Sequence, residues 1–410
     1  MAQQPFLKSI RPVNLLSFGP NTEEIELRPL NILIGPNGSG KSNLIEILGL
    51  LSKLPDKDPW SKVRKTGGAS EWTWKGEDAE NRPTSLSVTT TAEQFSMFSG
   101  LDGDKSLFYS IELFAGTGSF GVEAERFLEI EDGANGMLAN QDAFDRKGGE
   151  VFPRRTKSEN VWAQPSLELP LSSSVLSMFG KIPDLAISWP KMREFADNID
   201  RFAFYRDWVF GADSIAREPV SAGQPSERLQ EDVSNLAQIL ARFQSDFRPA
   251  FDLINEQMKK FYEPIKSVEI RIVSTHLQVA ILEEGGFSIP AYRLSDGTLR
   301  WLALLTILLN PTPGPVTCIE EPELGLHPDM IPTLADLLRD ASTRTQLIVT
   351  THSQSLVECF SDDPESVCVC EKIDGATRIR RLDKEKLGPW LEDYSLGQLW
   401  AKGEIGGNRW

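Results

Sequence analysis

The chain has 410 residues, of which 40% are hydrophobic, and its formal net charge is −16. This length and apolar content suffice for two or three lobes with packed cores, without disulfides or structural metals. The acidic balance argues against a surface that holds nucleic acid indiscriminately, because phosphate binding needs concentrated Lys and Arg. No window approaches the roughly 18 apolar residues that cross a bilayer, and the first residues lack the apolar core of a signal peptide. We therefore expect a soluble, cytoplasmic protein with no membrane contact.

The four cysteines lie inside apolar runs and lack the paired spacing of a zinc site or a secreted scaffold. They are Cys318, Cys359, Cys368 and Cys370. We expect buried thiols in a reducing compartment.

Three local clusters of basic residues interrupt the acidic chain, at 62–65, 146–157 and 378–381. Solvated loop or edge-strand charge is the favoured interpretation of each cluster. Direct DNA contact through one of them stays open.

The first 170 residues predict strands, one helix and then an antiparallel sheet. Strands are expected at 13–18, 23–30 and 31–35, followed by a strongly apolar helix from residue 42. From about 70 to 165, β-rich runs alternate with Gly, Asp and Asn, which is typical of an antiparallel meander with long loops. Residues 1–170 are therefore predicted to form an N-terminal lobe.

The rest of the chain changes pattern twice. Apolar residues at three- and four-residue spacing predict a helical lobe within 171–265. Strands and helices then alternate over 266–383, which predicts a largely parallel sheet covered on both faces. Residues 384–410 form a tail with Trp390, Trp400 and Trp410 among glycines; it either docks a partner or folds back onto the core.

The strongest motif lies between the strand near residue 31 and the following helix. It is a G-x-x-x-x-G-K-[ST] loop formed by Gly35, Pro36, Asn37, Gly38, Ser39, Gly40, Lys41 and Ser42. Its glycines let backbone N–H groups face phosphates, its lysine reaches the β- and γ-phosphate oxygens, and its final hydroxyl can bind Mg²⁺. We predict that this loop binds ATP with Mg²⁺.

A second motif is an apolar strand, 316–320, that ends in carboxylates. Its natural interpretation is a Walker B strand, in which Glu320 holds Mg²⁺ through water and Glu321 polarises the attacking water. The usual first acid is Asp, so Glu320 departs from the pattern by one methylene. The alternative is a strand that ends in solvated acids.

Two further features lie near the Walker B strand. Ser295 and Gly297 stand in an L-S-D-G-T segment at the start of an apolar helix, where a hydroxyl and a helix N-terminus can face a phosphate; an ordinary helix cap is the alternative. His327 and His352 follow the Walker B strand and the next strand, and a histidine at a strand tip can hydrogen-bond a γ-phosphate.

These motifs, in this order, resemble ABC-type ATPases of the RecF/SMC/OLD group, and in particular its small "predicted ATPase" branch. The resemblance covers the first fifty residues and most of 200–360. It implies an α/β fold: an ABC-type ATPase head with a mainly parallel sheet core, an antiparallel β lobe and a small helical lobe. It also implies that Ser295 and Gly297 complete the ATP site of a second subunit, and that His352 is the switch histidine. Gln164 is the candidate for the Q-loop glutamine.

The spacing of the motifs disfavours other P-loop classes. In AAA+ modules Walker B follows the P-loop helix soon, whereas here residues 54–315 intervene and L-S-D-G-T stands directly before the strand. Transporter subunits have a shorter insertion, and long-armed SMC proteins need heptads that are not found here. No Toprim nuclease region is recognised after the ATPase motifs.

Three functions follow from the resemblance. The favoured one is an ATP-hydrolysing switch whose ATP-dependent homodimer gates a separately encoded, Toprim-like nuclease effector in defence against phage. The second is a RecF-like DNA-binding ATPase used in repair, which the net charge disfavours. The third is a plain ATPase whose turnover is itself the output.

Overall fold

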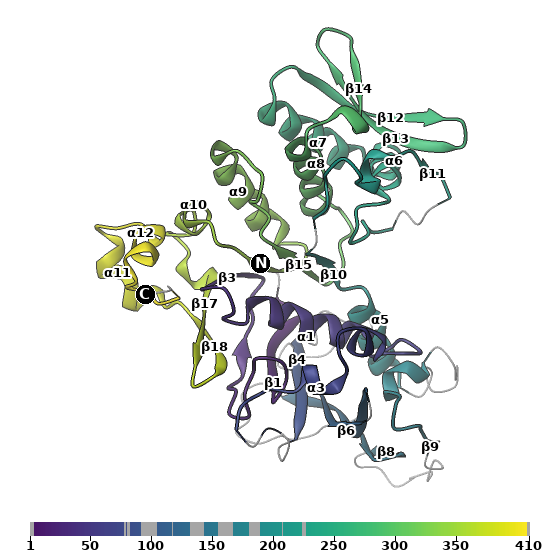
Figure 1. Ribbon diagram of the computed structural model, residues 1–410, viewed down its shortest axis with the longest axis vertical. Coiled ribbons are helices and arrows are strands. Elements are labelled where there is room, and N and C mark those ends of the chain that lie inside the picture. Colours follow the sequence, from purple (N-terminus) through teal and green to yellow (C-terminus); the bar gives the residue numbers. More distant parts are fainter. Residues whose placement is uncertain are drawn as a thin grey trace.

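The computed structural model describes residues 4–77, 79, 83–91, 105–116, 118–131, 143–154, 167–179, 189–206, 208–223 and 227–407. A central sheet separates a large antiparallel lobe from a smaller lobe of helices and short strands (Figure 1). This arrangement confirms the predicted α/β class with its parallel core, antiparallel lobe and helical lobe.

The central sheet has six strands in the order β10-β15-β16-β3-β17-β18. Neighbours are parallel except for the β17–β18 hairpin. Their bounds are β3 Leu30–Ile34, β10 Ala203–Tyr205, β15 Val316–Glu320, β16 Gln346–Thr350, β17 Val367–Ile373 and β18 Ala376–Arg381. Because parallel strands end at the same edge, β3, β15 and β16 carry the P-loop, the acidic motif and His352 to one side of the sheet.

Both faces of this sheet are covered, which explains why its strands are apolar throughout. On β3, Ile32 and Ile34 face one core and Leu33 faces the other. The first core contains helices α8 Asp296–Leu308, α9 Ile331–Ala341 and α10 Gln354–Glu358. The second contains α1 Lys41–Lys53, which packs between the central sheet and the antiparallel sheet.

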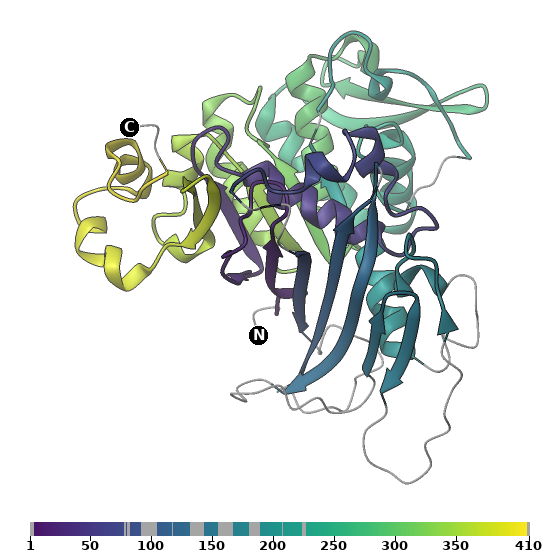
Figure 2. The same cartoon turned by 60° about the horizontal axis from the view of Figure 1, so that its bottom comes forward.

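The antiparallel lobe is an eight-stranded sheet in the order β2-β1-β4-β5-β6-β7-β8-β9. Its strands are β1 Leu7–Val13, β2 Ile25–Glu26, β4 Thr84–Thr91, β5 Lys105–Ala115, β6 Phe120–Glu131, β7 Ala143–Lys147, β8 Glu150–Arg154 and β9 Leu167–Glu168. Two short helices lie between β3 and β4 along the chain, α2 Ser61–Lys65 and α3 Ala69–Trp72. The first strand ends at Val13, where it was expected to begin, because Asn14 and Leu16 adopt positive φ values of 54° and 52° that cannot continue a strand. Figure 2 shows the long strands of this lobe side by side.

The helical lobe contains α6 Leu236–Asp246 and α7 Arg248–Phe261, which pack on α8. A small sheet joins them, made of β11 Val220–Ser221, β12 Ile265–Val273, β13 His276–Glu283 and β14 Ser288–Pro290. The boundaries expected at 170, 265 and 383 stay a prediction, but α5 Pro190–Asp200 packs with the core of the antiparallel lobe and not with α6 and α7.

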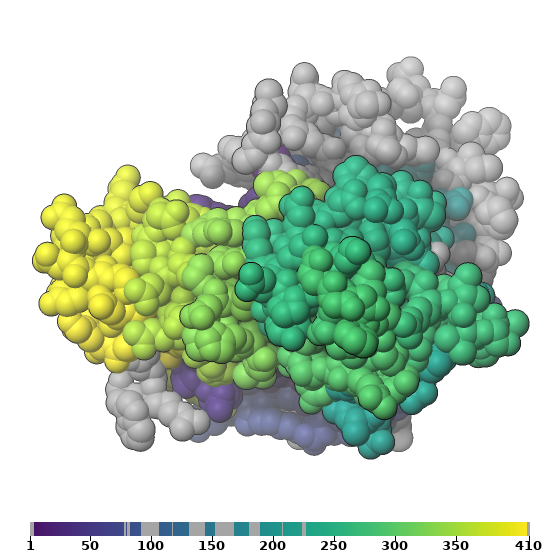
Figure 3. Space-filling view, turned by 90° about the horizontal axis from the view of Figure 1, so that it is seen from above, coloured from purple at the N-terminus to yellow at the C-terminus, as the bar shows by residue number. Residues whose placement is uncertain are grey.

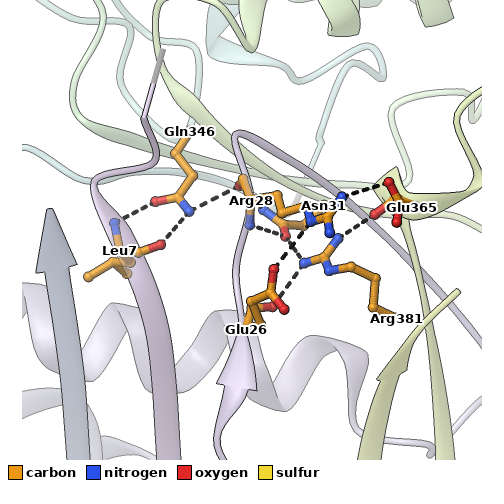
Figure 4. A network of polar contacts seen from close by, with 7 residues as sticks. All are labelled: Leu7, Glu26, Arg28, Asn31, Gln346, Glu365 and Arg381. Atoms are coloured by element: carbon orange, nitrogen blue, oxygen red, sulfur yellow. Dashed lines mark hydrogen bonds and ion pairs between the residues drawn. The ribbon is translucent and has the colours of Figure 1, made fainter. Parts of the chain in front are cut away.

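A network of hydrogen bonds and ion pairs connects the antiparallel sheet to the central sheet, at the edge opposite the P-loop (Figure 4). The side chain of Gln346 accepts a hydrogen bond from Leu7 N and donates one to Leu7 O, at 2.9 and 2.8 Å. Arg381 donates to Asn31 Oδ1, Glu26 O and Glu365 O. These contacts satisfy buried polar groups that would otherwise oppose the docking of the two sheets.

The tail forms α11 Lys384–Leu391 and α12 Leu396–Lys402, at one end of the molecule (Figure 3). Trp400 is 8% exposed and belongs to the core, whereas Trp390 is 48% exposed; Trp410 lies outside the described residues. The tail was expected either to dock a partner or to fold back onto the core. Helix α12 folds back onto the core.

Cys318, Cys368 and Cys370 are buried and Cys359 is half-buried, all as free thiols. Burial raises the pKa of each of them. Within the described ranges, no helix is both long and apolar enough to cross a bilayer.

Candidate nucleotide site

The loop from Gly35 to Ser42 joins β3 to α1 at the carboxyl edge of the central sheet. Gly35 and Gly40 have φ values of 148° and 100°, and each is tightly enclosed. A Cβ on Gly35 would lie 2.2 Å from Cys370 O, and one on Gly40 would lie 2.1 Å from Thr377 Oγ1. Glycine is therefore required at both positions by backbone conformation and by space.

The side chain of Lys41 lies inside the loop and binds its backbone. Its Nζ donates to Gly35 O and Pro36 O at 2.8 and 3.0 Å, and the residue is 6% exposed. Burial lowers the pKa of the Lys41 ammonium, while the negative charges of Glu321 and Glu320 act in the opposite direction. The lysine and both acids therefore share one electrostatic environment, as an ATP site requires.

Ser39 and Ser42 differ in their surroundings. Ser42 is exposed at the start of α1 and open to a ligand. The Ser39 hydroxyl is buried, and among the described residues it has no hydrogen-bond partner. An unsatisfied buried hydroxyl inside the loop fits a site whose polar ligand is a phosphate.

Glu320 lies at the end of β15, beside Arg206 of the neighbouring strand end. Arg206 Nε is 2.9 Å from Glu320 Oε1, and Trp208 Nε1 donates to Glu320 O at 3.1 Å. Because β10 and β15 are parallel, with Tyr205 opposite Ile319, the next residues of both strands meet at the sheet edge. Glu320, which stands where Asp is usual, is therefore paired with Arg206, a residue that the sequence motifs did not single out.

Glu321 adopts a left-handed conformation with φ 47°, which is unusual for a residue other than glycine. Two hydrogen bonds hold it there, from Glu321 N to Thr350 O at 2.9 Å and from Arg300 Nη2 to Glu321 O at 2.9 Å. Its carboxylate Oε1 is 3.7 Å from His352 Nε2, and both side chains are about one-third exposed. The acid expected to activate water and the expected switch histidine therefore lie together, facing solvent.

Glu323 is the buried member of the acidic motif, at 9% exposure. It accepts hydrogen bonds from Thr351 Oγ1 at 2.5 Å and His352 N at 3.2 Å. Burial raises the pKa of its carboxyl group, and those hydrogen bonds oppose the rise. Glu323 therefore holds the backbone of His352 in place through a hydrogen bond.

The L-S-D-G-T segment begins α8. Ser295 caps the helix by accepting from Thr298 N at 3.1 Å, so the ordinary cap is present. Both Ser295 and its neighbour Asp296 are exposed, and a Cβ on Gly297 would meet Gly325 O at 3.1 Å. Arg217 supports the turn by donating to Leu294 O and Ala291 O and pairing with Asp296.

Two cavities flank these motifs. One, of about 710 Å³, lies beside α1 and is lined by residues including Ser17, Asn43, Trp74 and Asp374. The other, of about 550 Å³, is lined by the residues Lys260, Phe261, Tyr262, Ser295, Thr298, His327, Asp329 and Met330. The second cavity contains the capping serine but none of the P-loop residues. The structure thus brings together Lys41, Glu320, Glu321 and His352, and gives Ser295 a separate cavity.

Four residues of the site escaped the sequence motifs: Arg206, Arg217, Arg300 and Glu323. The three arginines lie in the region of resemblance, 200–360, but no motif assigned a role to them, and only their partners in the structure reveal one. Glu323 lies two residues after Glu321, and only its burial in the structure reveals its role. Gln164, the candidate Q-loop residue, lies outside the described residues.

Magnesium fits the donors at this edge. In the described residues, no group of three His, Cys, Asp or Glu side chains could hold a metal by itself. Mg²⁺ normally takes one or two protein oxygens, with water and phosphate oxygens completing its shell. The exposed Ser42 hydroxyl and the half-buried Glu320 carboxylate, one of whose oxygens is paired with Arg206, would supply these protein oxygens.

Comparison with known families identifies the family of the chain. A model of the family described as "AAA domain, putative AbiEii toxin, Type IV TA system" matches residues 30–96 and 171–358, which is more than half of the chain. The chain belongs to this family. Members of the AAA domain family are nucleotide-binding ATPases, and the matched ranges contain the P-loop, the L-S-D-G-T segment, the acidic strand and His352. No curated protein matches the chain.

Solved structures agree on the fold of this family member. The Smc head bound to the C-winged helix domain of ScpA is 15% identical, covers 94% of this chain and 100% of its own, and has a TM-score of 0.54. An Smc head domain with an extended coiled coil from Pyrococcus furiosus, bound to the C-terminal domain of ScpA, is 13% identical, with coverages of 95% and 99% and a TM-score of 0.50. The chain therefore has the fold of an SMC head.

Proposed function

We propose that this ATPase works as a switch that closes as a head-to-tail homodimer, with each ATP between the P-loop of one copy and the Ser295 segment of the other. The observation that carries the proposal is the separate cavity around Ser295. A helix N-terminus with an exposed hydroxyl suits a phosphate, yet no P-loop residue lines that cavity. A second copy supplies the missing half.

In this proposal, Lys41 and the loop N–H groups of Gly35, Asn37, Gly38, Ser39 and Gly40 hold the phosphates, and Pro36, which has no N–H, shapes the loop. Ser42 and Glu320 hold Mg²⁺, which supplies charge stabilisation. Glu321 acts as general base toward the attacking water. His352, 3.7 Å from Glu321, senses the γ-phosphate. The cavity beside α1 takes the base, since Trp74 offers an indole there.

The proposed output is control of a separately encoded nuclease-type effector in defence against phage, carried out in the cytoplasm. The family description, which names a toxin of a toxin–antitoxin system, supports such a role. A DNA clamp finds less support because basic residues of two of the expected clusters form ion pairs within the chain. Arg146 has no exposed side-chain surface, Lys62 pairs with Glu46, and Arg64 pairs with Asp58.

The experiment is Glu321→Gln, which keeps the shape of the side chain and removes the base. ATP turnover should fall by about two to four orders of magnitude, while ATP binding persists and dimers accumulate with ATP in size-exclusion chromatography with light scattering. A nuclease encoded beside this chain should copurify with that trapped dimer and not with Lys41→Ala. Normal turnover by Glu321→Gln would contradict the assignment, and a trapped dimer that retains duplex DNA and no nuclease would favour the repair alternative.

A further inference from the structure

The C-terminal segment, defined here as residues 396–407, returns to the nucleotide site from the far end of the chain. Gly406 and Gly407 have φ values of 77° and 72°, a turn that favours glycine at both positions. A Cβ on Gly407 would lie 3.4 Å from the Cα of Gly35 and 3.0 Å from Val369 Cγ1. The first glycine of the P-loop therefore lies between Cys370 of β17 and the end of this segment.

Hydrogen bonds fix the turn in that position. Gly407 N donates to Glu371 Oε1 at 3.0 Å, and Trp400 Nε1 donates to Gly407 O at 3.3 Å. Arg380 Nη2 donates to Ile405 O at 3.0 Å, and Ile405 is 3% exposed. Glu371 directly follows Cys370, so one strand contacts both the P-loop and the C-terminal segment.

The other end of the same segment is attached next to His352. Helix α10 begins with its cap Ser353, the residue after His352. Leu396 N donates to Ser361 Oγ at 2.9 Å just beyond this helix, and a Cβ on Gly397 would lie 2.7 Å from Gln354 O. Helix α12 is therefore in close contact with the helix that follows the switch histidine.

From these contacts we infer that the C-terminal segment positions the P-loop relative to His352 and thereby sets the affinity for nucleotide. It links the two sides of one ATP site through Gly407 at Gly35 and Gly397 at α10. Glu371 is the central positioning residue, because it holds the glycine turn against the loop. The inference rests on the proposed binding of ATP at this loop.

The test compares Glu371→Ala with Glu371→Gln in the full chain. Alanine removes the acceptor for Gly407 N, whereas glutamine keeps an amide oxygen in its place. Binding of a fluorescent ATP analogue should weaken by about tenfold in Glu371→Ala, the loss expected for one hydrogen bond to a charged group, and should recover to near the wild-type value in Glu371→Gln. Trp400→Phe, which removes only the indole donor, should weaken binding in the same direction.

Kinetics separate positioning from general stability. KM for ATP should rise in Glu371→Ala while kcat at saturating ATP stays near the wild-type value, because Glu321 and His352 keep their contacts. A purely structural role would lower the melting temperature and the active fraction, leaving KM and the dissociation constant unchanged, and would overturn the inference. Glu392→Ala, exposed at the end of α11, is the control and should alter neither.

The outcomes also distinguish this inference from the proposed function. If the wild type binds no ATP, the proposed function fails. If the wild type binds ATP and Glu371→Ala binds it equally well, only the positioning role fails. Tighter binding by Glu371→Ala would mean that the segment obstructs the loop, which also overturns the inference.

Discussion

At the scale of single residues, three neighbouring glutamates that follow β15 have different surroundings. Glu320 is paired with Arg206, Glu321 is turned toward His352 by a left-handed backbone, and Glu323 is buried against the backbone of the histidine. The sequence predicted the first two from their place after an apolar strand. It could not predict the third, because burial depends on Thr351 and on the following turn.

Glu323 gives a prediction with a defined sign. Its carboxyl pKa is raised in the folded protein, chiefly by burial, so the folded state holds this proton more tightly than the unfolded chain does. The contribution of that proton to stability is present below the unfolded pKa and is lost as pH rises through the folded pKa. Glu323→Gln should therefore melt at a higher temperature than the wild type at pH 8 and lose that advantage near pH 4. An equal difference in melting temperature between Glu323→Gln and the wild type at both pH values would contradict a raised pKa of the Glu323 carboxyl group.

At the scale of elements, the sequence predicts the strands and helices that carry motifs. It does not predict which elements pack against one another. The apolar strand before the P-loop and helix 296–308 follow from local pattern alone. The assignment of α5 to the antiparallel lobe depends on contacts of Phe195 and Ile199 with distant strands. The basic cluster near Arg146 was expected at the surface, yet Arg146 is buried against Glu125, a partner on another strand.

The pair in the antiparallel lobe is testable against an exposed pair on the same two strands. Glu125 accepts from Tyr109, Ser174 and Val175, and Arg146 donates to three backbone carbonyls. Arg146→Ala leaves a buried carboxylate without its cation and should lower the free energy of unfolding by about 3–5 kcal/mol in urea titrations.

The matched control is Arg126→Ala, which removes a half-exposed partner of Asp145. It should cost less than about 1 kcal/mol. Equal losses in the two variants would show that Arg146 contributes no more than a surface charge.

At the scale of the whole molecule, the segments that we propose as the two halves of an ATP site lie apart within one copy. The P-loop, Glu320, Glu321 and His352 share the edge of the central sheet, whereas Ser295 opens a separate cavity on the helical side of α8. The sequence placed Ser295, the acidic strand and His352 in one lobe, and only the family resemblance implied that Ser295 serves the site of a second subunit. The identity of the partner and the trigger do not follow from sequence, since they depend on surfaces outside the motifs.

The central claim is that ATP is hydrolysed at sites shared between two copies. Lys41→Ala removes the ammonium group that we propose binds phosphate, and Ser295→Arg blocks the surface of the L-S-D-G-T segment, so each variant alone should be inactive. Mixing them should restore activity to about one quarter of the wild-type value per dimer at equal proportions, if half of the dimers are mixed, each has one intact site, and sites act independently. Subunit exchange, followed by fluorescence energy transfer between labelled copies, is the control. Recovered ATPase activity in the mixture is the predicted result, and its absence at every mixing ratio while exchange proceeds would contradict the shared site.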